Sequence, residues 1–252
     1  MKGSVYLVAG VGSGLGSAVT ALLASRGATV VAVARRSESL AAVEAQGRVR
    51  GWSLRPFVGD LSKEEDVDRL VRTVVKEAGP LDGACLQTGR WIAGDTLLHK
   101  TTDREWTEGL QSNLDAIFRV GRAVLPLLME RRRGSLVLIS AADRVRWSGN
   151  VAYCVAKGGL VDLTRKLARD YRPYGIRVNA VLPGTMEHDL PSLDPPDPSG
   201  PLALKDASGS GAWEAARMVS YLLGDEGRWI SGSAIPVDGG YSTFGSEPTP
   251  AP

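Results

Sequence analysis

Short apolar runs rich in β-branched residues alternate along the chain with longer segments whose apolar residues recur at helical spacing. The runs predict strands and the spaced segments predict amphipathic helices. The predicted strands cover residues 4–10, 28–34, 53–60, 81–87, 135–141, 175–184 and 232–240. The predicted helices cover residues 16–27, about 37–47, 62–79, 103–134, 151–173 and 213–226. Ser62, with Glu65 three residues later, predicts a capping box at the start of the third helix.

Strands that alternate with helices are typical of βαβ units, which build a parallel sheet covered on both faces. With right-handed crossovers we expect an α/β doubly wound parallel sheet of about seven strands, a three-layer α/β/α Rossmann fold that binds its ligand beyond the carboxyl ends of the strands. No linker divides the chain, so residues 1–244 are expected to form a single domain. Segment 185–211, rich in Pro, Asp, Gly and Ser, predicts a substrate lid, and residues 245–252 predict a disordered tail.

Composition narrows the class of protein without naming its chemistry. The 252 residues are 43% hydrophobic, the formal net charge is +2, and no apolar run reaches the roughly 18 residues of a membrane span. We therefore expect a cytoplasmic protein that binds no nucleic acid and no membrane. Cys85 and Cys154 lack metal-ligand spacing, so we expect reduced thiols and no metal site. The run Arg131–Arg133 suits the C-terminus of a helix, with docking of an acidic carrier as the alternative.

The turn between the first strand and the first helix is rich in glycine, with Gly10, Gly14 and Gly16 in AGVGSGLGSAV. Glycines here let the backbone approach a pyrophosphate, which also meets free N–H groups and the positive end of the helix. Tight packing of the helix against the strand is the alternative use of such glycines. Their position between the first strand and the first helix favours nucleotide binding.

The second strand ends in VVAVARR, nineteen residues after Gly16. An NAD site is expected to carry an acidic residue here for the ribose 2′-hydroxyl, whereas Arg35 and Arg36 suit a 2′-phosphate. We therefore expect NADP(H) to be preferred, with NAD(H) held by other contacts as the alternative. Asp60, at the end of the third strand, is expected to accept a hydrogen bond from the adenine amino group; a turn or N-cap residue is the alternative.

Tyr153 and Lys157 are four residues apart and therefore share one face of a predicted helix. A free tyrosine has a pKa of about 10, and a neighbouring ammonium is expected to lower it, as an oxidised nicotinamide would. Tyr153 would then donate a proton to a carbonyl oxygen, or accept one in the reverse reaction. By itself the spacing Y-x-x-x-K is common, so a helical Tyr and Lys with no joint role is the alternative.

Several motifs in one order make the chain resemble the short-chain dehydrogenase/reductase family over residues 3–243. They are the glycine turn G-x-x-x-G-x-G, GDLS with Asp60, QSNLDAIF with Asn113, YCVAK with Tyr153 and Lys157, IRVNAVLPG with Asn179, Pro183 and Gly184, and ISGSAIPVDGG. The chain is similar to 3-oxoacyl-carrier-protein reductase-like members of that family. The resemblance implies a Rossmann-type dinucleotide-binding and catalytic domain, hence an NAD(P)-dependent oxidoreductase.

The resemblance also implies a role for each matching residue. Tyr153 would be the general acid–base, Lys157 would lower its pKa and bind the nicotinamide ribose, and Asn113 would help hold a water of a proton relay. A polar kink in a long helix is the alternative for Asn113. Family members are commonly homotetramers, so helices 103–133 and 151–173 would form one interface; a dimer is the alternative. The implied cofactor-binding residues are Gly10, Ser13, Gly14, Leu15, Gly16, Arg35, Arg36, Asp60, Leu61, Thr88, Gly89, Tyr153, Lys157, Pro183, Gly184 and Thr185.

The chain departs from the family pattern at two places. LQTG stands at 86–89 where N-N-A-G is usual, so we expect altered local hydrogen bonding without loss of cofactor binding, with Gln87 as the candidate substitute for one Asn. The family's catalytic serine is the second of I-S-S after the fifth strand, which selects Ala141. The usual separation of thirteen residues from Tyr153 selects Ser140 instead. We favour Ser140 as the hydroxyl that holds the substrate oxygen.

The sequence thus favours an NADP-dependent oxidoreductase that transfers hydride between nicotinamide and a small carbonyl or secondary-alcohol substrate. A carrier-bound 3-oxoacyl group and a sugar or polyol both remain open. An alternative of another class is a catalytically weak or inactive NAD(P)-binding sensor or scaffold, which the altered N-N-A-G and the uncertain serine suggest. The residues expected around the substrate are Arg90, Trp91, Arg144, Arg146, Trp147 and His188.

Overall fold

Seven parallel strands form one sheet in the order β3-β2-β1-β4-β5-β6-β7 in a computed structural model of the chain. The structure describes residues 1–93, 97–186, 190, 192–197 and 211–244. All six pairings between named strands are parallel, which confirms the predicted fold class. The strands are β1 (Val5–Ala9), β2 (Thr29–Ala34), β3 (Ser53–Val58), β4 (Gly83–Leu86), β5 (Gly134–Ile139), β6 (Ile176–Pro183) and β7 (Ala234–Val237).

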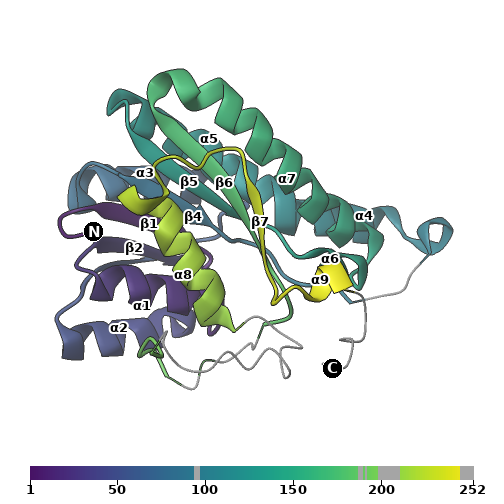
Figure 1. Ribbon diagram of the computed structural model, residues 1–252, viewed down its shortest axis with the longest axis horizontal. Coiled ribbons are helices and arrows are strands. Elements are labelled where there is room, and N and C mark those ends of the chain that lie inside the picture. Colours follow the sequence, from purple (N-terminus) through teal and green to yellow (C-terminus); the bar gives the residue numbers. More distant parts are fainter. Residues whose placement is uncertain (94–96, 187–189, 191, 198–210, 245–252) are drawn as a thin grey trace, which may run out of the picture.

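Helices cover both faces of this sheet and complete the three predicted layers (Figure 1). One face carries α1 (Leu15–Ser25), α2 (Glu38–Arg50) and α8 (Ala212–Leu223). The other face carries α3 (Glu64–Thr73), α5 (Ala116–Glu130) and α7 (Val151–Tyr171). Three shorter helices are α4 (Asp103–Leu110), α6 (Asp143–Trp147) and α9 (Tyr241–Phe244). No helix in the described ranges is long and apolar enough to cross a bilayer.

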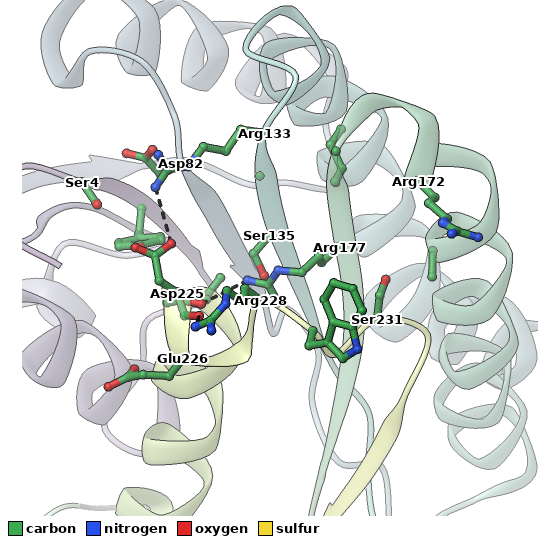
Figure 2. A pocket seen from close by; sticks show the side chains of 18 of the residues that line it. Ser4, Asp82, Arg133, Ser135, Arg172, Arg177, Asp225, Glu226, Arg228 and Ser231 are labelled. Carbon is green, nitrogen blue, oxygen red and sulfur yellow. Dashed lines mark hydrogen bonds and ion pairs between the residues drawn. The ribbon is translucent and has the colours of Figure 1, made fainter.

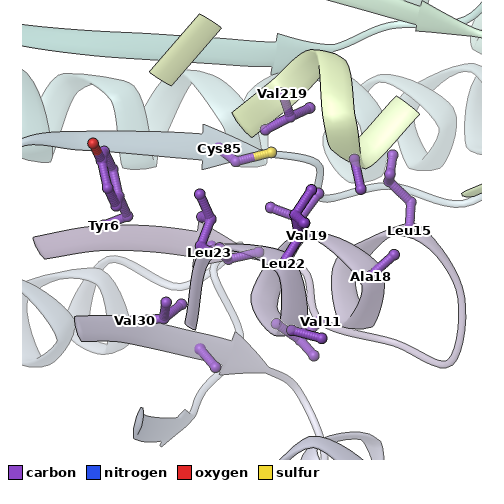
Figure 3. Packing of buried hydrophobic residues seen from close by; sticks show 14 of the residues in the cluster. Tyr6, Val11, Leu15, Ala18, Val19, Leu22, Leu23, Val30, Cys85 and Val219 are labelled. Carbon is purple, nitrogen blue, oxygen red and sulfur yellow. The ribbon is translucent and has the colours of Figure 1, made fainter. Parts of the chain in front are cut away.

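Two buried clusters, one on each face, hold the layers together. Because strand side chains alternate between faces, Leu7 of β1 packs with α3, α5 and α7, and its neighbour Val8 packs with α1 and α8. Figure 3 shows Leu22 of α1 and Val219 of α8 gathered with Cys85 of β4. Burial raises the pKa of the Cys85 thiol, so this residue acts as a neutral apolar filler in the core.

The long helix predicted at 103–134 is divided in the structure. After α4 the chain makes one π-helical turn, η3 (Gln111–Asp115), before α5 begins. Single π-turns within helices are rare and are frequent at functional sites, and this one contains Asn113. The helix predicted at 62–79 likewise begins as α3 and ends in the π-turn η1 (Val74–Ala78).

The capping box predicted at Ser62 is wrong. Ser62 donates its backbone N–H and its hydroxyl to Oδ1 of Asp60, at 3.0 and 2.7 Å, because an aspartate two residues earlier is within closer reach than the helix. Lys63 takes the N-cap position of α3 without a side-chain cap. A capping box forms at α4 instead, between Thr102 and Glu105.

The order of strands reverses between β1 and β4, and in doubly wound sheets ligands bind at the carboxyl edge beside such a reversal. Part of the predicted lid 185–211 is described and lies against this edge. Met186, Leu190 and Leu193 pack against the cluster formed by α1 and α8. The backbone N–H of Leu190 donates to the carbonyl of Ser13 in the glycine turn, at 3.1 Å. The predicted tail at 245–252 lies outside the described residues.

Candidate active site

The glycine turn between β1 and α1 is held against the end of β4 so closely that side chains are excluded. Gly10 has φ +102°, and a Cβ there would lie 3.1 Å from backbone atoms of Gln87 and Thr88. A Cβ on Gly16 would lie 2.2 Å from Nε2 of Gln87. Gly14 is the N-cap of α1 and leaves the first turn of that helix without a side-chain cap. The turn therefore presents bare backbone at a helix N-terminus, which suits a phosphate.

Two buried polar atoms beside this turn have no hydrogen-bond partner in the described structure. They are Oε1 of Gln87 and Oγ1 of Thr88. Nε2 of Gln87 donates to the carbonyl of Gly10 at 2.8 Å. Gln87 of LQTG therefore stabilises the glycine turn. Buried polar atoms without partners are costly, and a ligand with hydroxyl or amide donors would satisfy them. These two atoms therefore fit the sugar and nicotinamide side of a dinucleotide.

The ends of β2 and β3 lie at the same carboxyl edge of the sheet, where the sequence predicts the adenine half of the dinucleotide. Arg35 and Arg36 follow β2 and are exposed, as a 2′-phosphate site requires. Asp60 follows β3 and is partly buried, which opposes ionisation, but two hydrogen bonds from Ser62 and the charge of Arg35 lower its pKa. Asp60 thus makes the predicted turn, and its carboxylate is ionised at neutral pH. Its neighbour Leu61 is buried.

Tyr153 lies in the first turn of α7, and two residues before the helix shape its surroundings. The side chain of Asn150 caps the helix by accepting the backbone N–H of Tyr153 at 2.8 Å. A Cβ on Gly149 would lie 2.5 Å from Cδ1 of the Tyr153 ring. Both residues therefore position the tyrosine, and sequence reasoning missed them. The S-G-N stretch before the apolar helix was the available signal for the cap.

Burial moves the two central pKa values in opposite directions. It raises the pKa of the Tyr153 phenol to about 12 and lowers the pKa of the Lys157 ammonium to about 8. The expectation that Lys157 lowers the pKa of Tyr153 is not met here. The Nζ atom lies 6.0 Å from the ring centroid, and burial, which disfavours the charged phenolate, is the cause of the raised pKa. Nζ donates instead to the carbonyl of Ile139 at 3.0 Å.

Asn113, Lys157 and Gly89 meet at the end of β4. A Cβ on Gly89 would lie 2.4 Å from Oδ1 of Asn113 and 3.4 Å from Nζ of Lys157. Asn113 is fully buried; its Oδ1 accepts the N–H of Arg90 at 3.1 Å, and its Nδ2 donates to the carbonyl of Gly109 at the same distance. Asn113 therefore lies in a π-turn, as the alternative interpretation expected, and its side chain lies beside Gly89 near Lys157; its role in a proton relay stays a prediction.

Ser140 lies on the same face of the sheet as the tyrosine and lysine. The hydrogen bonds from β5 to β6 continue regularly past Ile139, with Ser140 N–H donating to Val181 and Ala142 N–H to Pro183, so no bulge shifts the alternation. Even-numbered β5 residues face α5 and α7, which puts Ala141 on the opposite face. The Ser140 hydroxyl donates to the backbone carbonyl of Lys157 at 2.6 Å.

The remaining predicted nicotinamide contacts follow β6. Pro183 is buried and its carbonyl accepts the N–H of Ala142, the N–H of Gly184 donates to Val237 at 3.1 Å, and Thr185 is exposed. These bonds fix the end of β6 beside the end of β5. Gly184 and Thr185 therefore lie at the carboxyl edge of the sheet.

The predicted substrate arginines already have partners within the fold. Arg144 stacks on the ring of Tyr241 at 3.9 Å, and Arg146 pairs with Asp143 at 2.6 Å. Arg90 lies 4.0 Å from Glu108. Trp91 and Trp147 are exposed. His188 lies outside the described residues, and the described part of the chain contains no cluster of metal-ligating side chains.

Known proteins are similar to this chain over nearly its whole length. Residues 10–242 match the family model described as Enoyl-(Acyl carrier protein) reductase. The chain is 33% identical over 242 residues to the 3-oxoacyl-[acyl-carrier-protein] reductase of Escherichia coli K12, covering 95% of this chain and 97% of that protein. Levodione reductase is similar at 30% identity and a TM-score of 0.85, covering 97% and 99%. A 3-ketoacyl-ACP reductase from Sinorhizobium meliloti 1021 is similar at 27% identity and a TM-score of 0.82, covering 94% and 98%.

Proposed function

The chain belongs to the short-chain dehydrogenase/reductase family, and from that membership we propose that it is an NADP(H)-dependent reductase of a ketone or aldehyde. The reverse reaction makes it an alcohol dehydrogenase. The proposal is carried by the meeting of Lys157 and Asn113 at Gly89, with Tyr153 one helical turn before the lysine, at the edge where the glycine turn lies.

The dinucleotide would be held along the whole carboxyl edge of the sheet. Gly10, Gly14 and Gly16 would take the pyrophosphate, and Arg35 and Arg36 would take the 2′-phosphate. Oγ1 of Thr88 and Oε1 of Gln87 would gain the partners that they lack. When bound, NADPH supplies the hydride.

The raised pKa of Tyr153 suits a proton donor. With a pKa of about 12 the phenol keeps its proton at neutral pH and can give it to the carbonyl oxygen of the substrate as that oxygen becomes an alkoxide. With a pKa of about 8, Lys157 is mainly an ammonium at pH 7 and stabilises the tyrosinate that remains. Asn113 lies near Lys157 beside Gly89 and would hold a water that returns a proton to the site.

Ser140 helps to position Tyr153 and Lys157, because its hydroxyl donates to the backbone carbonyl of Lys157 and so connects the end of β5 to α7. We propose that this positioning is its main role. The prediction that Ser140 also hydrogen-bonds the substrate stays a prediction, since it requires the hydroxyl to leave the Lys157 carbonyl.

We propose a 3-oxoacyl thioester as the substrate class. The Escherichia coli relative and the Sinorhizobium meliloti structure are both named for such substrates. The partners that Arg90, Arg144 and Arg146 have within the fold favour a neutral ketone at the reacting centre over an anionic one. A sensor or scaffold without catalysis is not favoured, because binding alone needs no buried tyrosine and lysine pair.

We further propose that the protein is a homo-oligomer assembled through α5 and α7. Phe118 on α5 and Val155 on α7 are about half exposed, at 51% and 46%, so each of the two helices presents an apolar side chain that an interface would cover.

The test is a turnover assay with NADPH and NADH against acetoacetyl-CoA, a ketose and a small ketone. We expect NADPH to be consumed fastest with the thioester, and Tyr153→Phe to abolish turnover while NADPH still binds. Tyr221→Phe, an exposed tyrosine outside the site, is the matched control and should keep full activity. The double substitution R35Q/R36Q should raise KM for NADPH and leave KM for NADH unchanged.

Two outcomes would oppose the proposal. If NADPH binds tightly but no substrate turns over, and Tyr153→Phe changes nothing, the protein is a binding module. If NADH serves as well as NADPH and R35Q/R36Q alters neither, the assignment of NADP(H) is wrong.

A further inference from the structure

A large cavity opens at the amino edge of the sheet, opposite the candidate active site. Its volume is about 1370 Å³, and its floor is formed where β1, β4, β5 and β6 begin, at Ser4, Asp82, Gly134 and Ile176. The end of α7 and the segment after α8 form its walls (Figure 2). We refer to it as the basal cavity. None of the residues assigned above to the cofactor or to catalysis lines it.

Seven arginines from five separate segments line the basal cavity. Arg165 and Arg169 near the end of α7 and Arg172 directly after it lie four and three residues apart, so they form one stripe. The others reach the cavity from the end of α1, the start of β5, β6 and the turn after α8, and they are Arg26, Arg133, Arg177 and Arg228.

The carboxylates of the cavity do not balance this charge. Only Asp82, Asp225 and Glu226 line it beside the seven arginines, an excess of four positive charges, whereas the whole chain has a net charge of +2. Asp82 is moreover engaged elsewhere, since it pairs with Arg131 at 3.1 Å and accepts the backbone N–H of Val5. The lining of the basal cavity is therefore more positive than the chain as a whole.

Five of the seven arginines form no ion pair with a carboxylate in the described part of the chain: Arg26, Arg169, Arg172, Arg177 and Arg228. Arg177 is half-buried, and its guanidinium donates only to the backbone carbonyls of Ile230 and Gly224. Burial lowers its pKa, the sign of a cation without full compensation. A partly desolvated charge of this kind is stabilised when an anion completes its surroundings.

We propose that the basal cavity is a second ligand site that binds a small molecule carrying two or more phosphate groups. Planar guanidinium groups match phosphate oxygens in paired hydrogen bonds. The cavity exceeds the roughly 300–1,000 Å³ of ordinary ligand pockets, which favours an extended polyphosphate over a single phosphate. Ser135 is buried and Arg177 is half-buried, so the lining extends into the fold, which favours a small anion over the flat surface of an acidic protein. The site is separate from the proposed reaction.

The experiment titrates inorganic tripolyphosphate into the protein saturated with NADPH, so that the cofactor site is already filled. Isothermal titration calorimetry should give one site per chain whose affinity falls as sodium chloride rises. R169Q/R172Q should weaken binding by at least about tenfold, since each hydrogen bond to a charged group contributes that much. Both residues are exposed and have no side-chain partner among the described residues, so these variants are expected to fold. R122Q, an exposed arginine paired with Glu64 elsewhere, should bind like the original protein.

Trp229 offers a second readout, because it lines the basal cavity and is 95% exposed. Tripolyphosphate should change the tryptophan fluorescence, and Trp229→Phe should remove that change. The proposal is overturned if tripolyphosphate gives no binding, if R169Q/R172Q binds it unchanged, or if R35Q/R36Q abolishes binding, which would place the anion in the cofactor site. Binding of polyglutamate without binding of tripolyphosphate would also overturn it, in favour of an acidic protein partner. None of these results depends on turnover, so they leave the proposed function untouched.

Discussion

Replacement of Ser140 by alanine separates a positioning role from direct contact with the substrate. The hydroxyl lies 2.6 Å from the Lys157 carbonyl and is buried, and such a bond contributes about 1 kcal/mol to folding. For a domain of this size that corresponds to a Tm lower by roughly 2–4 °C. Because the hydroxyl proton is engaged with the helix backbone, we expect kcat to fall by less than about tenfold. Removal of a donor to the reacting oxygen would cost about 10²–10³.

The chain supplies a matched control on the same strand. Ser135, at the start of β5, is equally buried and donates its hydroxyl to the Leu222 carbonyl of α8 at 2.8 Å. Ser135→Ala should lower Tm by a similar amount and leave kcat unchanged. Ala141→Ser should not restore activity to Ser140→Ala, because position 141 faces the other side of the sheet. A loss of a hundredfold or more in kcat for Ser140→Ala, or a clear gain from Ala141→Ser, would refute this reasoning.

Three further predictions concern the same site. The lowered pKa of Lys157 means that its positive charge is present below about pH 8 and lost above it. The kcat for reduction should therefore fall as the pH rises through about 8, and Lys157→Met should be slow and lack this pH step. An inflection of kcat near the ordinary lysine pKa would contradict this prediction. Gly89→Ala combines a positive φ, which costs about 1–3 kcal/mol, with a Cβ that would clash with Oδ1 of Asn113, and it should lower kcat strongly. Gly51→Ala, with φ +66° and open space around the Cβ, should lower stability alone. Equal kcat values for the two variants in a steady-state assay would count against this prediction. Asn150→Ala removes the N-cap of α7, so it should lower the free energy of unfolding, measured with denaturant, by about 1 kcal/mol and should also lower kcat. If neither value changes, Asn150 does not position Tyr153.

The helices and strands followed from local patterns that the sequence carries in full. Periodicity of 2 and of 3.6 depends only on neighbouring residues, so the seven strands and the main helices could be predicted, with errors at their ends. The two interruptions by π-turns could not, because they depend on what a helix packs against. The error at Ser62 arose in the same way: Asp60 competed for its hydroxyl, and sequence spacing alone does not rank the two partners.

The candidate site was predictable where its members share an element and less so where they do not. Tyr153 and Lys157 lie on one helix face, and the glycines lie in one turn, so spacing alone grouped them. The sequence predicted that Lys157 lowers the pKa of Tyr153, whereas burial raises it, and burial is a property of the packed structure that spacing does not reveal. It missed Gly149, whose importance lies only in the closeness of the tyrosine ring.

The sequence by itself determined the parallel α/β sheet, the glycine turn and the pairing of a tyrosine with a lysine. These features depend on residues close together in the sequence, because the regular geometry of a helix, strand or turn fixes the relative positions of such residues. Tertiary structure decided which partner the Ser140 hydroxyl meets, and that Asn113, Gly89 and Lys157 converge. It alone gathered seven arginines from five segments into the basal cavity. Such meetings join residues far apart in the chain, and only the packing of the layers brings them together.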